Sequence, residues 1–322
     1  MSFWRSPGFW LNFLLIFVGG ALVLLIHQDT LRETAFTVLM YIALASSLNI
    51  IMGLTGYVNF GHIVFFGLGG YFGFFMLSQM GWPLYLSMLA GGCLSAAVAL
   101  VIGAAVLRLR GAYFALATIG VNEAARAFVA NFKPFGGATG LFVNFSVYDQ
   151  YGGSASALWW IFTLLWIVAT LTVVVGYLVK HSRFGLGLIA IREDEDAAMV
   201  MGVRAPLAKT IAFALSAFFP ALVGTLYFFK NGNVEPEDAF RFQLSLEILV
   251  MVMLGGKGLV LGPILGAFAY ERLRGYLLIS PLFKNLHLAL SGGILLVIVL
   301  FVPGGVVGWF RERFPRLRRL LE

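Results

Sequence analysis

The stretch Gly53–Tyr71 reads GLTGYVNFGHIVFFGLGGY and lies between two strongly apolar runs. Six of its 19 residues are glycine, and it also carries Asn59 and His62. A helix that faces lipid on all sides would avoid such residues, because irregular backbone inside a membrane must be buried in protein or must line a watery cavity. An apolar segment that is interrupted by glycines and a few polar groups is typical of a transport pathway.

The composition indicates a membrane protein. The chain has 322 residues, of which 60% are hydrophobic and 11% are charged, whereas about 25% of the residues of a soluble domain are charged. The net charge of +7 does not indicate a nucleic-acid partner, because the basic residues cluster beside apolar runs, as in membrane proteins with a fixed orientation. The single cysteine, Cys93, allows no disulfide within the chain, and we expect it to be buried in a helix interface.

The apolar runs predict an all-α, polytopic integral membrane protein with about ten transmembrane helices. The predicted spans are 9–26, 33–52, 60–78, 84–107, 112–130, 157–179, 208–229, 243–255, 259–279 and 287–308. The eighth and ninth are short and are separated by glycines. No cleavage site of the A-x-A type follows the first span, so we expect that span to be retained.

The distribution of Lys and Arg predicts the orientation. With ten spans and a cytoplasmic N-terminus, the basic segments 108–110, 180–209 and 311–319 all fall on the cytoplasmic side, which agrees with the positive-inside rule. The C-terminus is then also cytoplasmic, and its basic tail would lie on anionic membrane lipid. The polar loops 131–156 and 180–207 are too small to bury cores of their own, so residues 1–322 are predicted to form one transmembrane domain.

The glycine pattern of the opening stretch has an echo near the C-terminus. Gly53-x-x-Gly56 followed by Gly61 resembles Gly255-x-x-Gly258 followed by Gly262 and Pro263. Paired interruptions of this kind in two halves of a chain indicate a structural repeat around a central path.

Two groups of charged residues allow a functional and a structural interpretation. Residues 188–201 predict an amphipathic helix, with Ile191, Ala198 and Met201 on its apolar face and Gly202 ending it. This helix is either a solvated surface element or a rigid knob that transmits force from a soluble partner.

Glu123 and Arg126 lie three residues apart, and therefore on one face, in the fifth span. They form either an ion pair that fixes helix packing or part of a path or gate, and the neighbouring Asn122 shares one of these roles. We expect His62 to be hydrogen-bonded, with no metal site, and Asn59 to satisfy backbone groups that the interruption frees.

Four segments together resemble a known family. The segment Asp196-Ala197-Ala198-x-x-x-Gly202 resembles the Glu-Ala-Ala-x-x-x-Gly loop of ABC-importer permeases, although Asp replaces Glu and the downstream Leu-Pro is missing. The other segments are 53–71, 107–115 and 255–267, and all occur in the same order as in the family. Nearly all of the chain thereby resembles the permease subunits of the branched-chain amino acid importers, and specifically the M-type subunit of the Liv family.

The resemblance implies a single permease domain in the inner membrane of a prokaryote. It implies as partners a homologous second permease subunit, two cytoplasmic ATP-binding subunits and a periplasmic or extracellular substrate-binding protein. The chain itself carries no G-x-x-x-x-G-K-[ST] loop for a triphosphate, so we expect neither a cofactor nor enzymatic activity. Related permeases import urea and short amides, which remain alternative substrates. A stand-alone secondary transporter would need an ion site at Glu123 or His62.

The predicted site residues fall into two groups. The predicted ATPase-coupling residues are Arg192, Glu193, Asp194, Glu195, Asp196, Ala197, Ala198 and Gly202. The predicted residues of the translocation path and its broken segments are Gly56, Asn59, Gly61, His62, Phe65, Gly67, Gly69, Tyr71, Asn122, Glu123, Arg126, Gly255, Gly258, Gly262 and Pro263. A zwitterionic amino acid suits the second group, because helix ends and freed backbone groups can meet its carboxylate and ammonium.

Overall fold

A computed structural model describes residues 7–279, 292–293 and 304–313. Nearly all of the regular structure in these ranges is helical, which confirms the predicted all-α class. The principal helices are α1 (Pro7–Ile26), α2 (Asp29–Thr55), α3 (Ile63–Ser78), α4 (Leu84–Val106), α5 (Ala112–Asn131), α7 (Ser154–Lys180), α8 (Arg183–Glu193), α9 (Glu195–Val200), α10 (Ala205–Asn231), α12 (Phe242–Gly255), α13 (Leu261–Ile279) and α15 (Gly305–Arg313). Most of the tenth predicted span, 287–308, and the end of the basic tail lie outside the described residues.

Short elements make up the segments between α5 and α7 and between α10 and α12. They are the 3-10 turns Lys133–Phe135 and Gly137–Thr139, the strands β1 (Leu141–Phe142) and β2 (Asn233–Val234), and the one-turn helices α6 (Ser146–Asp149) and α11 (Pro236–Ala239). The two strands pair antiparallel, with Leu141 opposite Val234. This ladder joins the loops 131–156 and 230–242, which the predicted orientation places outside the membrane.

Five described helices, α1, α2, α4, α7 and α10, are long and apolar enough to cross a membrane. The helices α3 and α12 have 16 and 14 residues, or about 24 and 21 Å at 1.5 Å per residue, which is less than the ~30 Å hydrocarbon core. α5 and α13 have the length but fall short of the same apolarity. The count of ten spans therefore stays a prediction.

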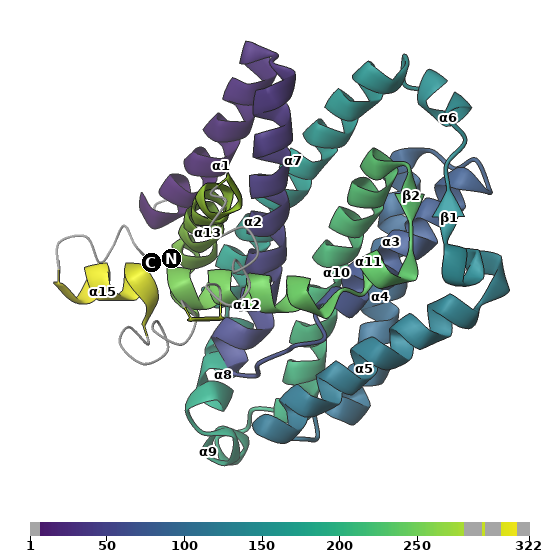
Figure 1. Ribbon diagram of the computed structural model, residues 1–322. Coiled ribbons are helices and arrows are strands. Elements are labelled where there is room, and N and C mark those ends of the chain that lie inside the picture. Colours follow the sequence, from purple (N-terminus) through teal and green to yellow (C-terminus); the bar gives the residue numbers. More distant parts are fainter. Residues whose placement is uncertain (1–6, 280–291, 294–303, 314–322) are drawn as a thin grey trace.

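The helices α2 and α10 form the centre of the bundle. Most residues of both are buried inside the chain, whereas α1 and α4 expose large apolar side chains, among them Leu22, Leu25 and Val101. Exposed apolar side chains on long helices are what a lipid environment favours. Figure 1 shows α8 and α9 together at one end of the bundle and α12 running across α2.

The first predicted interruption separates α2 from α3. Gly56 adopts φ 78° after the last residue of α2 and donates its N–H to Met52 O, and regular helix resumes only at Ile63. Asn59 Oδ1 accepts a hydrogen bond from the N–H of Gly61 at 2.9 Å. This contact confirms that Asn59 satisfies a backbone group that the interruption frees.

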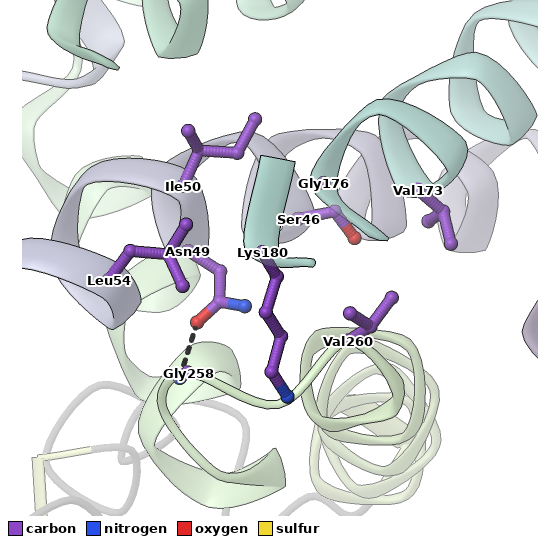
Figure 2. A pocket seen from close by; sticks show the side chains of 9 residues that line it. All are labelled: Ser46, Asn49, Ile50, Leu54, Val173, Gly176, Lys180, Gly258 and Val260. Atoms are coloured by element: carbon purple, nitrogen blue, oxygen red, sulfur yellow. Dashed lines mark hydrogen bonds between the residues drawn. The ribbon is translucent and has the colours of Figure 1, made fainter. Parts of the chain in front are cut away.

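The second interruption, between α12 and α13, packs directly on the first. The side chain of Asn49 in α2 donates to Leu259 O at 2.9 Å and accepts from the N–H of Gly258 at 2.8 Å, as Figure 2 shows for Gly258. A Cβ on Gly53 would lie 2.6 Å from the nitrogen of Gly258 and would overlap Asn49 Oδ1. The two glycine-rich segments that resemble each other in sequence are thus in contact through their backbones.

The prediction of one continuous helix over residues 188–201 is wrong, and one residue of its predicted apolar face is exposed. It consists of α8 and α9, because the Asp194 side chain accepts hydrogen bonds from the N–H groups of Asp196 and Ala197, both at 3.0 Å, and so starts a new helix as an N-cap. Ile191 and Ala198 are buried as predicted, but Met201 is 84% exposed. Gly202 adopts φ 90°, which confirms the predicted left-handed end.

Cys93 is also placed differently from the prediction. It lies on an exposed face of α4 and not in a helix interface. The neighbouring Gly91 and Gly92 are the residues that face the bundle, where they approach α3 and α10. The apolar run in which Cys93 occurs does not reveal which of its faces is buried, because lipid and protein interior favour the same residues.

The substitution Gly53→Ala tests the contact between the two interruptions. We expect the free energy of unfolding to fall by about 1–3 kcal/mol, because a methyl group has no room beside Gly258. The melting temperature of the detergent-purified protein measures this effect. Gly120→Ala is the control, since nothing lies within 4 Å of a Cβ at that helical position. Equal melting temperatures of the two variants would contradict the contact.

Candidate functional site

The segment α8–α9 carries the predicted ATPase-coupling residues and is called the coupling segment below. Arg192 bonds it to the backbone at the first interruption. Its guanidinium donates to Gly53 O at 3.0 Å through one terminal nitrogen and to Glu193 at 2.8 Å through the other. The stem of Arg192 also lies against Gly56, 3.0 Å from the position of a Cβ there. The predicted coupling residue Arg192 is therefore a link between α8 and the end of α2.

Glu195 forms a second, buried link, which we call the Glu195 cluster and which consists of Tyr57, Glu195 and Lys209. The carboxylate accepts a hydrogen bond from Lys209 Nζ at 2.6 Å and another from the Tyr57 hydroxyl at 2.7 Å. Lys209 also donates to the Tyr57 oxygen at 2.8 Å and to Leu107 O at 3.0 Å. The cluster thus joins α9, the first interruption, the start of α10 and the end of α4.

The two charged side chains of the cluster are largely buried, and each neutralises the charge of the other. The side chains of Glu195 and Lys209 are 12% and 3% exposed. Burial raises the pKa of the Glu195 carboxyl, but Lys209, Tyr57 and the Arg110 guanidinium at 3.7 Å lower it more, so that this pKa lies below its ordinary value. Glu195 is therefore ionised at neutral pH, and removing either charge alone would leave the other buried without its partner.

Asp196 and Arg110 form a more exposed pair beside the cluster. Two guanidinium nitrogens of Arg110 donate to the two carboxylate oxygens of Asp196 at 3.0 and 2.8 Å, and these bonds lower the pKa of Asp196. The side chains are 53% and 70% exposed, so water weakens the attraction. Asp196 consequently provides a natural comparison for the buried Glu195.

His62 and the side chains that contact it are buried at the first interruption. Nε2 of His62 lies 2.9 Å from the Ser47 hydroxyl, which confirms a hydrogen-bonded histidine. Its ring is next to that of Phe65, which packs edge-on against Phe213 in α10. In the ranges that the structure describes, no three His, Cys, Asp or Glu residues gather to form a metal site.

The other predicted path residues of α3 make close packing contacts in the interior. Gly67 faces Phe240 and Gly69 faces Ala221, in both cases with no space for a Cβ. The Tyr71 hydroxyl donates to Val234 O at 3.2 Å, and Asn122 donates from α5 to Phe240 O at 3.0 Å. Gly67, Tyr71 and Asn122 thus hold α3 and α5 against the segment that precedes α12, and Gly69 packs α3 on α10.

Gly61, Gly255 and Gly262 also lie at backbone contacts. Gly61 faces Thr118 O, and Gly255 packs against the backbone of Gly262, which is next to Pro263 near the start of α13. The close contacts of the three glycines account for their small size, so the sequence-based role of all four residues in a path remains a proposal.

Glu123 and Arg126 form the predicted ion pair, with nitrogen and oxygen 2.8 Å apart. The side chains are 53% and 43% exposed on a helix that also exposes Leu116 and Phe128. Ionisable groups at membrane depth face a partner, a cavity or each other. The pair is thus on the outside of this chain, and both the packing and the path interpretation stay open.

Sequence reasoning missed Asn49, Tyr57 and Lys209, although each makes bonds that join the interruptions to the coupling segment. Asn49 is a polar residue within an otherwise apolar run, which is the signal that could have identified it. Lys209 was counted only for its effect on orientation. Its partner Glu195 is among the predicted coupling residues, but the sequence does not reveal that the two residues pair.

Comparison with known proteins identifies relatives along nearly the whole chain. Residues 30–299 match the family model described as "Branched-chain amino acid transport system / permease component". The high-affinity branched-chain amino acid transport system permease proteins LivM of Salmonella typhimurium and Escherichia coli are each 29% identical over 313 residues, covering 87% of this chain and 71% of the relative. The ribose import permease protein RbsC of Haemophilus influenzae is 26% identical over 140 residues, covering 42% of this chain and 43% of the relative. No solved structure matches.

Lys209→Met is expected to destabilise the protein strongly. Removing one partner of a buried ion pair costs about 3–5 kcal/mol, because the remaining charge is left in a poorly solvated place. The double variant Glu195→Gln, Lys209→Met should recover part of this loss. The melting temperature of the purified protein is the measurement, and Asp196→Asn is the control with a small effect. Lys209→Met and Asp196→Asn with equal melting temperatures would show that the buried pair contributes nothing.

Acidification should weaken the same cluster. A carboxyl whose pKa is lowered by folding contributes stability above its ordinary value of 4.5, and this contribution is lost as the pH falls through the lowered pKa. We therefore expect the difference in melting temperature between the wild type and the double variant to shrink below about pH 4.5. A difference that is constant between pH 7 and pH 3 would contradict this expectation.

Proposed function

Since this chain belongs to the family of permease components of branched-chain amino acid transport systems, we propose that it is the transmembrane permease subunit of an ABC importer for leucine, isoleucine and valine. The similarity to the two LivM proteins over 87% of the chain supports this substrate class. The ATP would be bound and hydrolysed by separate subunits. The observation that carries the proposal is the α8–α9 segment, which is bonded to the first interruption at both Arg192 and Glu195.

We propose that residues 1–322 form one permease domain with about ten spans in the inner membrane of a prokaryote, with both termini in the cytoplasm. The location of α8 and α9 at one end of the bundle (Figure 1) agrees with this orientation. The basic residues of 180–209 then lie on the cytoplasmic side. The loops 131–156 and 230–242 lie on the outer side, where a substrate-binding protein would deliver its cargo.

The tip of α9 is the proposed docking surface for an ATP-binding subunit. Val200 and Met201 are 87% and 84% exposed, and the exposed carboxylates of Glu193 and Asp196 lie on the same segment. An exposed apolar patch with a charged rim is typical of a protein–protein interface. A push on this tip would pass through Arg192 to Gly53 and through Glu195 to Tyr57.

The exposed face of α5 is the proposed contact with the second permease subunit. A homologous partner that packs on this face would cover Glu123 and Arg126, which would otherwise be exposed to water or lipid. The substrate would cross between the two subunits near the interruptions. Movement of the first interruption would then change which side of the membrane the path opens to.

The double variant Val200→Glu, Met201→Glu tests the docking surface. We expect it to abolish co-purification of the ATP-binding subunits and ATP-driven leucine uptake into vesicles, because two carboxylates replace the apolar contact, while the membrane content of the permease stays unchanged. Met80→Glu is a matched control. Met80 is 54% exposed and follows the end of α3 that is remote from the first interruption and from α9.

Gly202→Pro is a second variant with the same expected outcome. Proline cannot adopt the φ of 90° and lacks the N–H that Gly202 donates to Met199 O at 3.0 Å. Normal uptake and normal co-purification by both coupling variants would contradict the proposed role of α9.

A further inference from the structure

A charged cavity lies beside the N-terminal half of α2, away from the end of α2 that contacts α8 and α9. Its volume is about 160 Å³, and its walls come from the N-terminal half of α2, the end of α10, the segment 238–244 and α13. Tyr41 in its wall precedes Thr55, at the coupling end of α2, by 14 residues, or about 21 Å along the helix. In the proposed orientation the cavity is on the outer side.

One wall of the cavity is a buried chain of hydrogen bonds that positions Arg274. The guanidinium donates to the Tyr41 hydroxyl at 2.7 Å, and Tyr41 in turn donates to Glu247 at 3.0 Å. Gln243 donates to the second carboxylate oxygen at 3.2 Å. Tyr41 and Glu247 are each 2% exposed, so they fix Arg274 from behind while Arg274 itself lines the cavity.

The cavity is lined by cationic donors and a carboxylate whose hydrogen-bonding capacity is only partly used within the described part of the chain. Arg274 lies 3.7 Å from the carboxylate of Glu271, beyond the length of a hydrogen bond, and its Nε is buried without a hydrogen-bond partner among the described residues. The side chains of Arg241 and Asp238 form an ion pair with nitrogen and oxygen 3.6 Å apart, which is beyond the length of a hydrogen bond. Lys230 differs, because it is bonded to Glu33 at 2.7 Å and lies over the ring of Phe36.

The remaining wall is mainly apolar. It is formed by Phe36, Met40, Phe66 and Leu244, together with Thr37 and Tyr227. The cavity volume is close to the ~150 Å³ that accommodates benzene in an engineered protein cavity, and so it is large enough for a branched side chain of four carbons. An apolar wall with a few converging charged groups is typical of a small-molecule site.

We propose that this cavity is a binding site for an L-α-amino acid with an aliphatic side chain. Arg274 and Arg241 bind the carboxylate, because guanidinium groups form strong, directed bonds with carboxylates. Asp238 binds the ammonium, and the apolar wall receives the side chain. The inference rests on the proposed function and adds to it the place and the groups that recognise the substrate. It differs from the sequence-based expectation, in which freed backbone groups at the interruptions meet the substrate charges.

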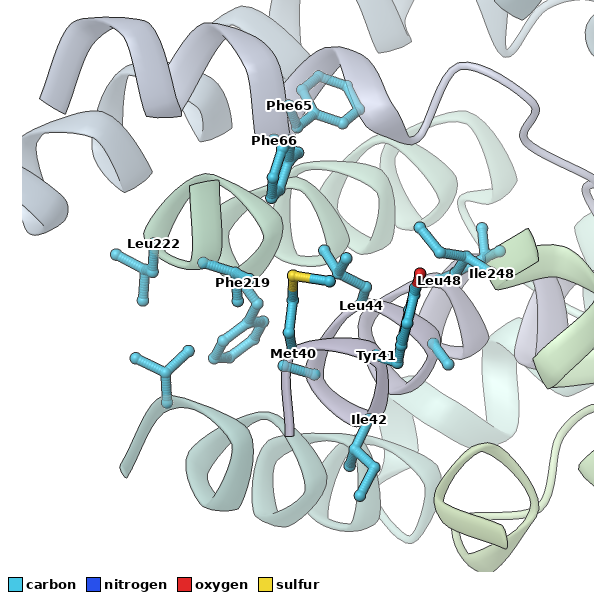
Figure 3. Packing of buried hydrophobic residues seen from close by; sticks show 14 of the residues in the cluster. Met40, Tyr41, Ile42, Leu44, Leu48, Phe65, Phe66, Phe219, Leu222 and Ile248 are labelled. Atoms are coloured by element: carbon cyan, nitrogen blue, oxygen red, sulfur yellow. The ribbon is translucent and has the colours of Figure 1, made fainter. Parts of the chain in front are cut away.

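Apolar side chains close the cavity on the side of the coupling segment. Leu44 and Leu48 follow Tyr41 along α2 by about one and two helical turns, and both are fully buried, as is Ile248 in α12. Figure 3 shows these three side chains in the packed cluster next to Met40 and Tyr41. A substrate in the cavity would therefore be held above a dry layer until the helices move.

The test uses the purified complex of the permease subunits and the ATP-binding subunits, without the substrate-binding protein. We expect L-leucine to raise its melting temperature, whereas leucinamide, which lacks the carboxylate, and 4-methylpentanoate, which lacks the ammonium, have no effect. Arg274→Gln and Asp238→Asn should abolish the response to L-leucine. Arg272→Gln, a change of the neighbouring arginine in α13 outside the cavity lining, should retain it. Absence of a leucine response in the wild-type complex would overturn the site.

Uptake by vesicles that contain the same complexes, with the binding protein added, separates the site from the function. We expect Arg274→Gln, Asp238→Asn and the cavity-filling Leu244→Trp to lower leucine uptake tenfold or more. If Arg274→Gln fails to assemble, Arg241→Gln replaces it, since Arg241 is 45% exposed. Wild-type uptake by all assembled variants would refute the site and leave the function standing. A wild-type complex that imports no aliphatic amino acid would refute the function itself.

Discussion

The ion pair between Glu195 and Lys209 is the contact on which the proposed coupling depends. It is buried, it includes the Tyr57 hydroxyl, and it joins the tip of the coupling segment to the irregular backbone that follows α2. Buried charges in such an arrangement tolerate little separation, because each would lose its partner in a place that water solvates poorly. Together with the bond from Arg192 to Gly53, the pair would make α9 and the first interruption move as one unit in the proposed coupling.

The second interruption is connected to this unit through α2. Asn49 binds the backbone at Gly258 and Leu259, and the neighbouring Gly53 leaves no space between the two backbones. The opposite half of α2 carries Tyr41, which belongs to the charged cavity. One buried helix therefore contacts the coupling segment at its end, the two interruptions in its second half and the cavity in its first half. A displacement of α2 would change all three together, which is the physical basis of alternating access in this account.

The sequence predicted those features that depend on local chemistry. Glycine at a left-handed position identified the end of α9 at Gly202, and the pattern of glycines identified both interruptions. It could not predict contacts between residues that are far apart in the chain, such as Asn49 with Leu259 or Tyr41 with Glu247, which are separated by 210 and 206 positions. It also could not distinguish a lipid-facing from a buried face within an apolar run, which is why Cys93 was misplaced. The break at Asp194 was missed because a capping aspartate within a charged run has the same appearance as a solvated surface residue.

The most direct test of coupling is a distance measurement during the ATP cycle. Spin labels at Met199→Cys in α9 and Val58→Cys in the first interruption, in a Cys93→Ser background, report the separation of these two segments in the assembled transporter in lipid vesicles. A third label at Met80→Cys is paired with Met199→Cys in one sample and with Val58→Cys in another. These pairs report the movement of α9 and of the first interruption relative to the opposite end of the bundle. The account predicts that the 199–58 distance stays constant between the nucleotide-free and ATP-bound states while the 199–80 distance changes. A change in the 199–58 distance with a constant 58–80 distance would show that α9 moves without the interruption, and would contradict the account.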